Sequence, residues 1–514
     1  MRRIARSLAV LGLLVLAFAG RLEASGPEGQ MTWAVPFALA PTFFEPAEAS
    51  GLIAPFIMYY ALHDALVKPM PGQAIAPGVA ESWSAAPDGL AYEFVLRKNV
   101  RFHTGDLLTA EDVKFSFERY RGVAARSFKT RVASVDVVDP HRVRVVLKQP
   151  WPDFLTFVGT PATGAAWIVP KKYVERVGDE GFKKAPVGAG PYRFVSFNPG
   201  VEVVLEAFEH YWRKTPHVKR LVFKVVPDES TRLAMLKRGE ADVAITFLGA
   251  LAEELKRSPG LTIKPTYMPW TQWVSFNAEP WDPKSPWRDQ RVRLAANLAM
   301  DRPAINQALF LGLSKVTASI IPQLFDFSWA APPYPHDPAK AKQLLAEAGY
   351  PSGFDGGTLS SDLVYASFAE AAANYLAAVG IRLKLTPMER AAHTKALQEK
   401  KIRGLSVIGT ASFGNAATRI EAYVAGTGSF AWGSYPDLDG LFQEQASETD
   451  KKRREAILVK IQQAMHDRAL FVPLLEPALL NGHGPRVSES GLGLIAGLAY
   501  SAPYEDVKLK TPSK

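Results

Sequence analysis

The sequence holds few residue sets whose types and spacing are typical of catalysis. It contains no cysteine, which excludes thiolate catalysis, disulfides and Cys-based zinc or iron–sulfur sites. Its nine histidines include no pair spaced three to five residues apart, and neither G-x-S-x-G nor S-x-x-K occurs. Hydrolysis would therefore depend on a long-range set of Ser, His and Asp, which nothing local supports. We predict no catalytic residues, no metal site and no cofactor.

Aromatic side chains near Gly, Pro or Ser form the second set with a possible chemical role. Each one alone is typical of core packing. As a group they favour the lining of a cleft in which a few polar groups orient an organic ligand. They lack an interleaved basic run, so they do not predict nucleic-acid binding. The set includes Phe43, Phe44, Tyr59, Tyr60, Trp270, Trp273, Phe413, Phe430 and Trp432.

The formal net charge is +9, which permits two interpretations. One is an anionic partner, and the other is a basic surface spread over a large protein. No run of five or six like charges occurs, which favours the second interpretation.

A strand, a turn and a capped helix are predicted between residues 92 and 120. The alternation from Tyr92 to Leu96 indicates a half-buried strand. Thr109 begins a helix with acidic residues in its first turn, where the helix dipole favours negative charge. His103, Asp106 and Asp112 are therefore interpreted as turn and cap residues rather than as a polar site.

The glycine-rich segment from Pro186 to Tyr192 is a weak candidate for a phosphate loop. A strand, Tyr192 to Phe197, is predicted after it instead of a helix, so no helix N-terminus is available for a phosphate. We interpret the segment as a turn that leads into this strand.

Strands and helices alternate from Leu221 onward. A strand at 223–226, a helix ending at Gly239 and a strand at 241–245 predict a βαβ unit with parallel strands. A strongly amphipathic helix is predicted from Asp450 to His466. The fold class is α/β with mixed sheets, and the length allows two or three domains.

The N-terminus is typical of a secretory signal peptide, predicted at residues 1–24. Arg2, Arg3 and Arg6 precede an apolar run from Leu8 to Ala19, which is too short to span a bilayer. Without cysteine, no lipid anchor is predicted. We expect a periplasmic protein.

Several motifs in a fixed order resemble the extracytoplasmic solute-binding proteins of ABC importers, peptide/nickel type (family 5). The resemblance covers about residues 30–510. The motif from Pro186 to Tyr192 is similar to P-x-G-T-G-P-Y, with Ala189 in place of Thr. The most specific matches are Glu81-Ser82-Trp83, Asp88-Gly89, Leu96-Arg97, Phe102-His103, Leu108-Thr109-Ala110 and Asp112-Val113.

The resemblance implies a two-lobed periplasmic-binding-protein fold of type II, in the large form with an extra subdomain. Lobe I would comprise residues 25–275 and 485–514, with the extra subdomain at about 55–185. Lobe II would comprise residues 276–484. A monomer would enclose a small-molecule or short-peptide ligand between its lobes and deliver it to ABC permease subunits, with no bond broken.

The loop after the strand Leu405 to Gly409 departs from the family pattern. In peptide-binding members an aspartate there pairs with the peptide's amino terminus, whereas residues 410–417 here contain no carboxylate. A buried ammonium without a charged partner costs several kcal/mol. This weakens the prediction of a free-amine dipeptide, although Glu45 or Asn415 could compensate.

A peptide or peptide-like solute is therefore predicted by resemblance. An opine, a sugar or a metal chelate remains an alternative, and a secreted hydrolase is a remote one. The predicted ligand-binding residues are Phe43, Phe44, Glu45 and Tyr59 from lobe I, and Trp273, Thr410, Phe413, Asn415 and Trp432 from lobe II or the crossing.

Overall fold

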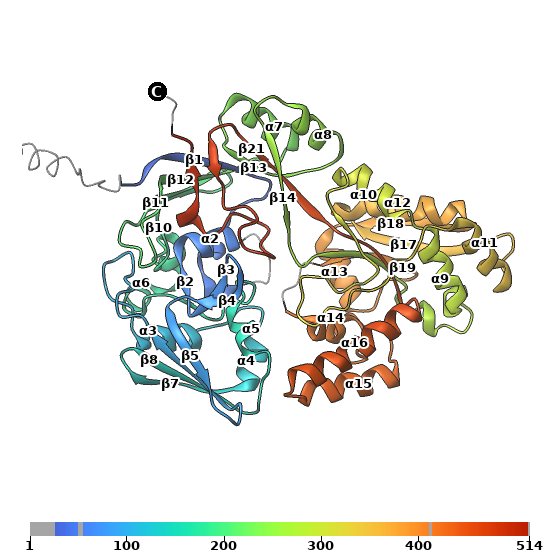
Figure 1. Ribbon diagram of the computed structural model, residues 1–514, viewed down its shortest axis with the longest axis horizontal. Helices are drawn as coiled ribbons and strands as arrows, with labels where there is room; N and C mark the ends of the chain where they lie inside the picture. Colours follow the sequence, from blue (N-terminus) through green and yellow to red (C-terminus); the bar gives the residue numbers. More distant parts are fainter. Residues whose placement is uncertain (1–25, 50–54, 411–413, 512–514) are drawn as a thin grey trace, which may run out of the picture.

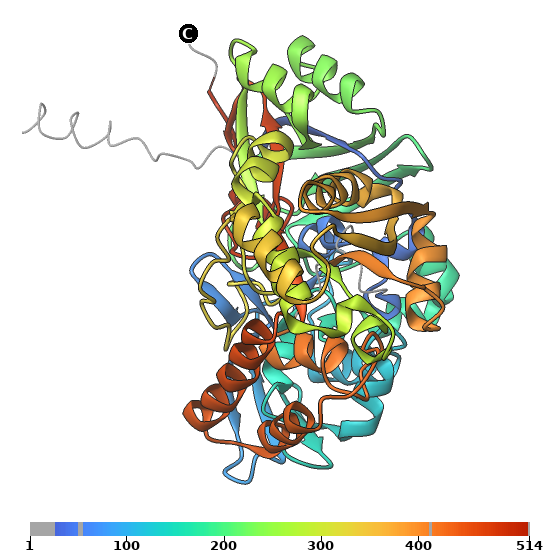
Figure 2. The same cartoon turned by 90° about the vertical axis from the view of Figure 1, so that its right-hand side faces the viewer.

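The computed structural model describes residues 26–49, 55–410 and 414–511. These residues form two lobes that lie side by side and are joined near the top of Figure 1; Figure 2 shows the same arrangement from the side of the second lobe. Each lobe has a mixed β-sheet and a hydrophobic core of its own. The predicted α/β class is confirmed. Within the described part of the chain, no helix has the length and apolar character needed to cross a membrane.

Lobe I is built on a seven-stranded sheet with the order β10-β11-β12-β1-β13-β21-β14. Helix α7 connects β12 to β13, and both strands run parallel to β1. The predicted βαβ unit is confirmed, since Asp228 caps α7 and Gly239 ends it with a φ of 71°. The bounds are β1 Glu28–Val35, β10 Tyr192–Asn198, β11 Glu202–Ala207, β12 Val218–Val225, α7 Glu229–Arg238, β13 Val243–Phe247, α8 Gly249–Arg257, β14 Thr262–Tyr267 and β21 Ala478–His483.

The extra subdomain, at the lower left of Figure 1, contains an antiparallel four-stranded sheet with the order β5-β6-β8-β7. The strand predicted from Tyr92 to Leu96 is β6, and the helix predicted to begin at Thr109 is α3. A capping box joins Thr109 and Asp112, so Asp112 is a cap residue as expected. The bounds are β5 Ala80–Ala85, β6 Ala91–Leu96, α3 Ala110–Glu118, α4 Ala125–Arg131, β7 Val132–Asp139, β8 Arg142–Leu147, α5 Phe154–Gly159 and α6 Lys171–Lys184.

The glycine-rich segment packs against the end of helix α2 (Phe56–Leu62). A Cβ on Gly188 would lie 1.9 Å from the carbonyl oxygen of Leu62, and the Gly190 amide donates to that oxygen at 3.0 Å. His103 accepts from the Gly188 amide at 3.2 Å, and its Nε2 lies 3.1 Å from the Gly190 carbonyl oxygen. The segment is a turn leading into β10, as predicted, and only glycine fits this approach of two backbones.

Two small sheets connect this subdomain to the rest of lobe I. One pairs β2 (Asp64–Ala65) with β9 (Trp167–Ile168), and the other is the hairpin of β3 (Val67–Met70) and β4 (Gln73–Pro77).

Lobe II is built on a six-stranded sheet with the order β16-β20-β15-β19-β17-β18. Strand β17 runs parallel to both β18 and β19. Helix α16 begins after the N-cap Asp450 and confirms the predicted amphipathic helix. The bounds are β15 Thr271–Ser275, α9 Gln290–Ala299, α10 Arg302–Phe310, β16 Lys315–Val316, α11 Pro338–Glu347, β17 Phe354–Asp362, α12 Ala366–Ala378, β18 Ile381–Met388, α13 Arg390–Gln398, β19 Leu405–Thr410, α14 Ala416–Tyr423, α15 Pro436–Ser447, α16 Lys451–Asp467 and β20 Phe471–Glu476.

The chain passes between the lobes where one strand ends and the next begins in the other sheet. Strand β14 of lobe I ends at Tyr267 and β15 of lobe II begins at Thr271, while β20 and β21 are separated by residue 477 alone. After β21 the chain stays with lobe I, where β22 (Val487–Glu489) pairs with β23 (Lys508–Leu509). Sheet membership thus favours crossings slightly before the predicted limits at 275 and 484, and the domain limits remain a proposal.

Candidate binding cleft

Asp153, directly before α5, joins the extra subdomain of lobe I to lobe II. Both of its carboxylate oxygens accept from Arg454 of α16 at 2.8 Å, and Oδ1 also accepts from the side-chain amide of Asn415 at 2.7 Å. Gln445 accepts from the Arg454 Nε at 3.1 Å. The Arg454 side chain is only 7% exposed. This bidentate ion pair and its two amide partners hold the lobes in contact.

A cavity of about 530 Å³ lies between the lobes beside this ion pair. We call it the polar chamber, because hydroxyl, amide and charged side chains line most of it. Its charged members are the paired Asp153 and Arg454, together with Arg131 and Glu421. Its uncharged polar members are Ser127, Gln149, Thr156, Thr160, Thr163, Asn415, Thr418, Thr427, Gln443 and Gln445.

A second cavity of about 370 Å³ lies on the side of the cleft toward the crossing residue Pro269. We call it the apolar chamber. Asp326 is its one charged lining residue among those described, and it is exposed. Thr156, Thr160 and Gly414 line both chambers, so the two cavities adjoin at α5. The apolar members are Pro69, Met70, Ile75, Pro269, Leu324, Phe325, Ile495 and Leu498.

The carboxyl ends of β17 and β19 lie close together in lobe II. The Tyr365 hydroxyl, after β17, donates to the carbonyl of Gly409 in β19 at 3.4 Å, and Arg390 donates to Asp362 at 3.0 Å. The Trp270 ring lies 6.1 Å from the Tyr365 ring. Burial raises the pKa of Tyr365 to about 12, so its phenol stays neutral at physiological pH. Open α/β sheets bind ligands at such strand ends.

The predicted site residues of lobe I lie in or against its core. The Phe44 ring is fully buried and lies 5.5 Å from the rings of Phe194 and Phe197, while Phe43 is half-buried against the same core. Tyr59 is buried against Trp167 at a ring distance of 5.6 Å, and burial raises the pKa of its phenol. None of these three side chains lines either chamber.

Glu45 is fully buried and its carboxylate is engaged within lobe I. Arg119 donates to both oxygens at 2.8 Å, and the Ala47 amide donates to Oε1 at 3.0 Å. Asp179 also accepts from Arg119, at 2.6 Å. The carboxylate of Glu45 therefore completes a hydrogen-bond network inside lobe I, and Glu45 lines neither chamber. It is not placed to pair with the amino group of a ligand in either chamber.

The predicted residues of lobe II and the crossing are spread over several places. Trp273 is fully buried, with Tyr423 and Phe471 packed edge-on against its ring. Thr410 ends β19, and Phe413 lies outside the described residues. Of the predicted residues that the structure describes, only Asn415 lines the polar chamber, where it also caps α14.

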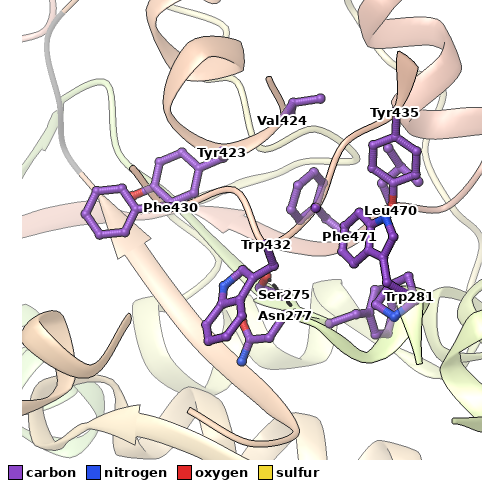
Figure 3. Close-up of a pocket in the computed structure, with 13 residues that line it drawn as sticks. Ser275, Asn277, Trp281, Tyr423, Val424, Phe430, Trp432, Tyr435, Leu470 and Phe471 are labelled. Atoms are coloured by element: carbon purple, nitrogen blue, oxygen red, sulfur yellow. Dashed lines mark hydrogen bonds between the residues drawn. The ribbon is translucent and has the colours of Figure 1, made fainter. Parts of the chain in front are cut away.

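Trp432 belongs to a different aromatic pocket of lobe II, shown in Figure 3. Tyr423 and Phe430 stack there at 5.1 Å, and Trp281 packs at 5.1 Å from Tyr435. The free volume is about 20 Å³, which accommodates a single water but no organic solute.

Asp153, Arg131, Arg454 and the apolar chamber were not among the sequence-based site predictions. A signal for Arg454 does exist in the sequence. It lies three and four residues before Ile457 and Leu458, on the apolar face of an amphipathic helix. A cation on such a face indicates a partner from elsewhere in the fold, but the sequence does not say which one. Among the described residues, no group of three or more His, Cys, Asp or Glu could hold a metal ion.

The model of the bacterial extracellular solute-binding proteins, family 5 (middle region), matches residues 74–431. The chain belongs to this family. The predicted family and the solute-binding role in an ABC importer are confirmed, and proteins of this family bind solutes for transport rather than catalyse a reaction.

The relatives span nearly the whole chain. Heme-binding protein A of Haemophilus influenzae is 29% identical over 491 residues, which covers 88% of each chain. The glutathione-binding protein GsiB of Salmonella choleraesuis is 27% identical over 450 residues, 84% of this chain and 86% of that one. The solved structure of the periplasmic binding protein DppA of Helicobacter pylori, in complex with the peptide STSA, has a TM-score of 0.73 at 25% identity. It covers 95% of this chain and 99% of the other.

Proposed function

We propose that this chain is exported to the periplasm, encloses a peptide or peptide-like solute between its lobes, and delivers it to the membrane subunits of an ABC importer. Export rests on the predicted signal peptide at residues 1–24, which lie outside the described residues. We further propose that the protein acts as a monomer, because one chain supplies both walls of the cleft.

The polar chamber is the observation that carries this proposal. Its volume of about 530 Å³ is within the range of small-molecule sites, and residues of both lobes line it. A solute that contacts both walls gains interactions only when the lobes are together, and it therefore stabilises the closed form. The interlobe bonds of Asp153 lie beside the same cavity, so closure and solute contact involve the same surfaces.

Two unpaired charges in the polar chamber fit the ends of a peptide. Arg131 and Glu421 have no ion pair with another described residue. An arginine binds a carboxylate in a bidentate manner, and a glutamate binds an ammonium. Glu421 thus offers a carboxylate at the cleft, although residues 410–417 contain none. The predicted site residues Asn415, at this chamber, and Thr410, at the nearby strand end, remain our candidates for polar contacts.

The class of ligand can be identified directly. Mass spectrometry of the solute released from purified protein would name the compound, and thermal unfolding with peptides, opines, sugars and metal chelates would test each class. A ligand at one hundred times its Kd adds about 2.7 kcal/mol to the free energy of unfolding. Stabilisation by a non-peptide class alone would replace the peptide proposal. A protein that no class stabilises, and whose lobes never close in solution scattering, would contradict the binding function.

A further inference from the structure

The two chambers of the cleft differ in chemistry although they adjoin. The polar chamber presents hydroxyls, amides and four charged groups. The apolar chamber presents hydrocarbon side chains from the β3–β4 hairpin, from residues 324–325 and from residues 495–498. A polar group left unbonded in the second chamber would cost several kcal/mol, whereas an apolar group there would be stabilised by leaving water.

Helix α5 lies where the chambers meet. Thr156 of this helix and Thr160, the residue directly after it, line both cavities, and Gly414 of lobe II lines both as well. The two cavities therefore share a boundary at these residues, which places the apolar chamber within reach of a solute bound in the polar one.

The charges in the polar chamber indicate which end of such a solute lies there. The Arg131 guanidinium is half-buried, 4.8 Å from the centre of the Trp151 ring, and forms no ion pair with a described carboxylate. The Arg454 guanidinium is already matched by Asp153. Arg131 is thus the cation available for a carboxylate of the solute.

We propose that the native solute is an amphipathic acid, whose carboxylate lies against Arg131 and whose bulky apolar group fills the apolar chamber. The proposal rests on the proposed function, since it assigns the two halves of a peptide-like solute to the two chambers. It distinguishes this site from one for compact, wholly polar peptides.

A matched pair of tripeptides tests whether the site binds an apolar group of the solute. Leu and Asn have similar size and shape, so Ala-Leu-Ala and Ala-Asn-Ala differ mainly in the polarity of one side chain. We expect calorimetry to show Ala-Leu-Ala binding about tenfold or more tightly, the effect of burying one leucine side chain. Equal binding, or a preference for Ala-Asn-Ala, would overturn the amphipathic assignment and leave the peptide function standing. No binding of either peptide would overturn both.

A substitution in the apolar chamber, with a matched control outside it, tests where the apolar group of the solute lies. Leu324 is 39% exposed and lines the apolar chamber, whereas Leu385 is 36% exposed and lines neither chamber. Leu324→Asn should reduce the preference for Ala-Leu-Ala about threefold or more, and Leu385→Asn should leave it unchanged. The same loss in both variants, or in neither, would contradict the placement of the apolar group.

Arg131 has a control of similar chemistry in Arg176. The Arg176 guanidinium lies 5.2 Å from the centre of the Tyr173 ring, on α6 and outside both chambers. Arg131→Gln should weaken Ala-Leu-Ala about tenfold, but leave its C-terminal amide, which lacks the carboxylate, within twofold of wild type. Arg176→Gln should change neither. If Arg131→Gln weakens the acid and the amide equally, Arg131 does not bind the carboxylate.

Discussion

The segments around Glu45 and Asp153 both place an acidic residue beside aromatic rings, yet the two carboxylates pair in different directions. Glu45 is fully buried and pairs with Arg119 inside lobe I. Asp153 pairs with Arg454 across the cleft. Both pairs are bidentate and have similar distances, so their geometry alone does not distinguish them. The difference is that the first pair can break only when lobe I unfolds, whereas the second can break when the lobes separate.

The largest effect is expected for Glu45→Gln. Removal of this charge leaves Arg119, whose side chain is only 9% exposed, with Asp179 as its remaining carboxylate. Breaking a buried ion pair by removing one partner costs about 3–5 kcal/mol. Urea unfolding should show a loss of this size. Glu93→Gln, which breaks exposed pairs with Arg142 and Arg144, is the control and should cost about 1 kcal/mol or less. Similar losses in both variants would show that the buried Glu45 pair contributes no more to stability than an exposed pair does.

The second prediction concerns pH and the core beside the Glu45 segment. His63 is fully buried, and its Nε2 lies 2.9 Å from the Phe44 carbonyl oxygen. Burial lowers the pKa of His63 to about 3 from its ordinary 6.5. Between these values the unfolded chain binds the proton and the folded chain does not, so stability present above pH 6.5 is lost as the pH falls.

The measurement is the free energy of unfolding as a function of pH. From pH 6.5 to about 4.5 we expect His63 to contribute a loss of roughly 2 kcal/mol. His63→Asn, which keeps a side-chain donor but does not titrate, should flatten this slope even if it lowers stability overall. An unchanged slope in the variant would assign the acid sensitivity to other groups.

Asp153→Asn should act on the position of the lobes rather than on folding. Arg454 becomes hydrated when the lobes separate, so the free energy of unfolding should change by less than about 1 kcal/mol. Solution scattering of the ligand-free variant should show a larger radius of gyration than that of wild type. Asp437→Asn breaks an ion pair with Arg468 that lies within lobe II, and it should leave the radius unchanged. A compact Asp153→Asn protein would show that other contacts hold the lobes together.

The smallest effect is expected for Trp432→Ala. The ring lies in the aromatic pocket of lobe II, 5.4 Å from the Lys400 ammonium and outside both chambers. Peptide binding measured by calorimetry should stay within about twofold of wild type, because no new charge is buried or exposed at the cleft. A loss of tenfold or more would place Trp432 in the binding site, as predicted from the sequence.

Much of the fold could be predicted because its signals are local. Strand β6, the capping box of α3, the βαβ unit around α7 and the turn before β10 each follow from neighbouring residue types. The site could not be predicted in the same way. Trp273 and Phe44 look like exposed aromatics because they adjoin loop residues, but both are fully buried. Tyr423 and Phe471 pack against Trp273, and Phe194 and Phe197 pack against Phe44. Side-chain burial depends on which distant elements pack on a segment, and a single sequence does not state this.

The sequence by itself determined the family, the α/β class and the absence of cysteine chemistry, because these depend on residue types and on motifs a few residues long. Only the tertiary structure decided which acid belongs to the lobe I core and which one bridges the lobes. Asp153 lies 262 residues before Asn415 and 301 before Arg454 along the chain. Contacts between residues so far apart in the chain form only when both lobes have folded and come into contact, so no local sequence pattern predicts them.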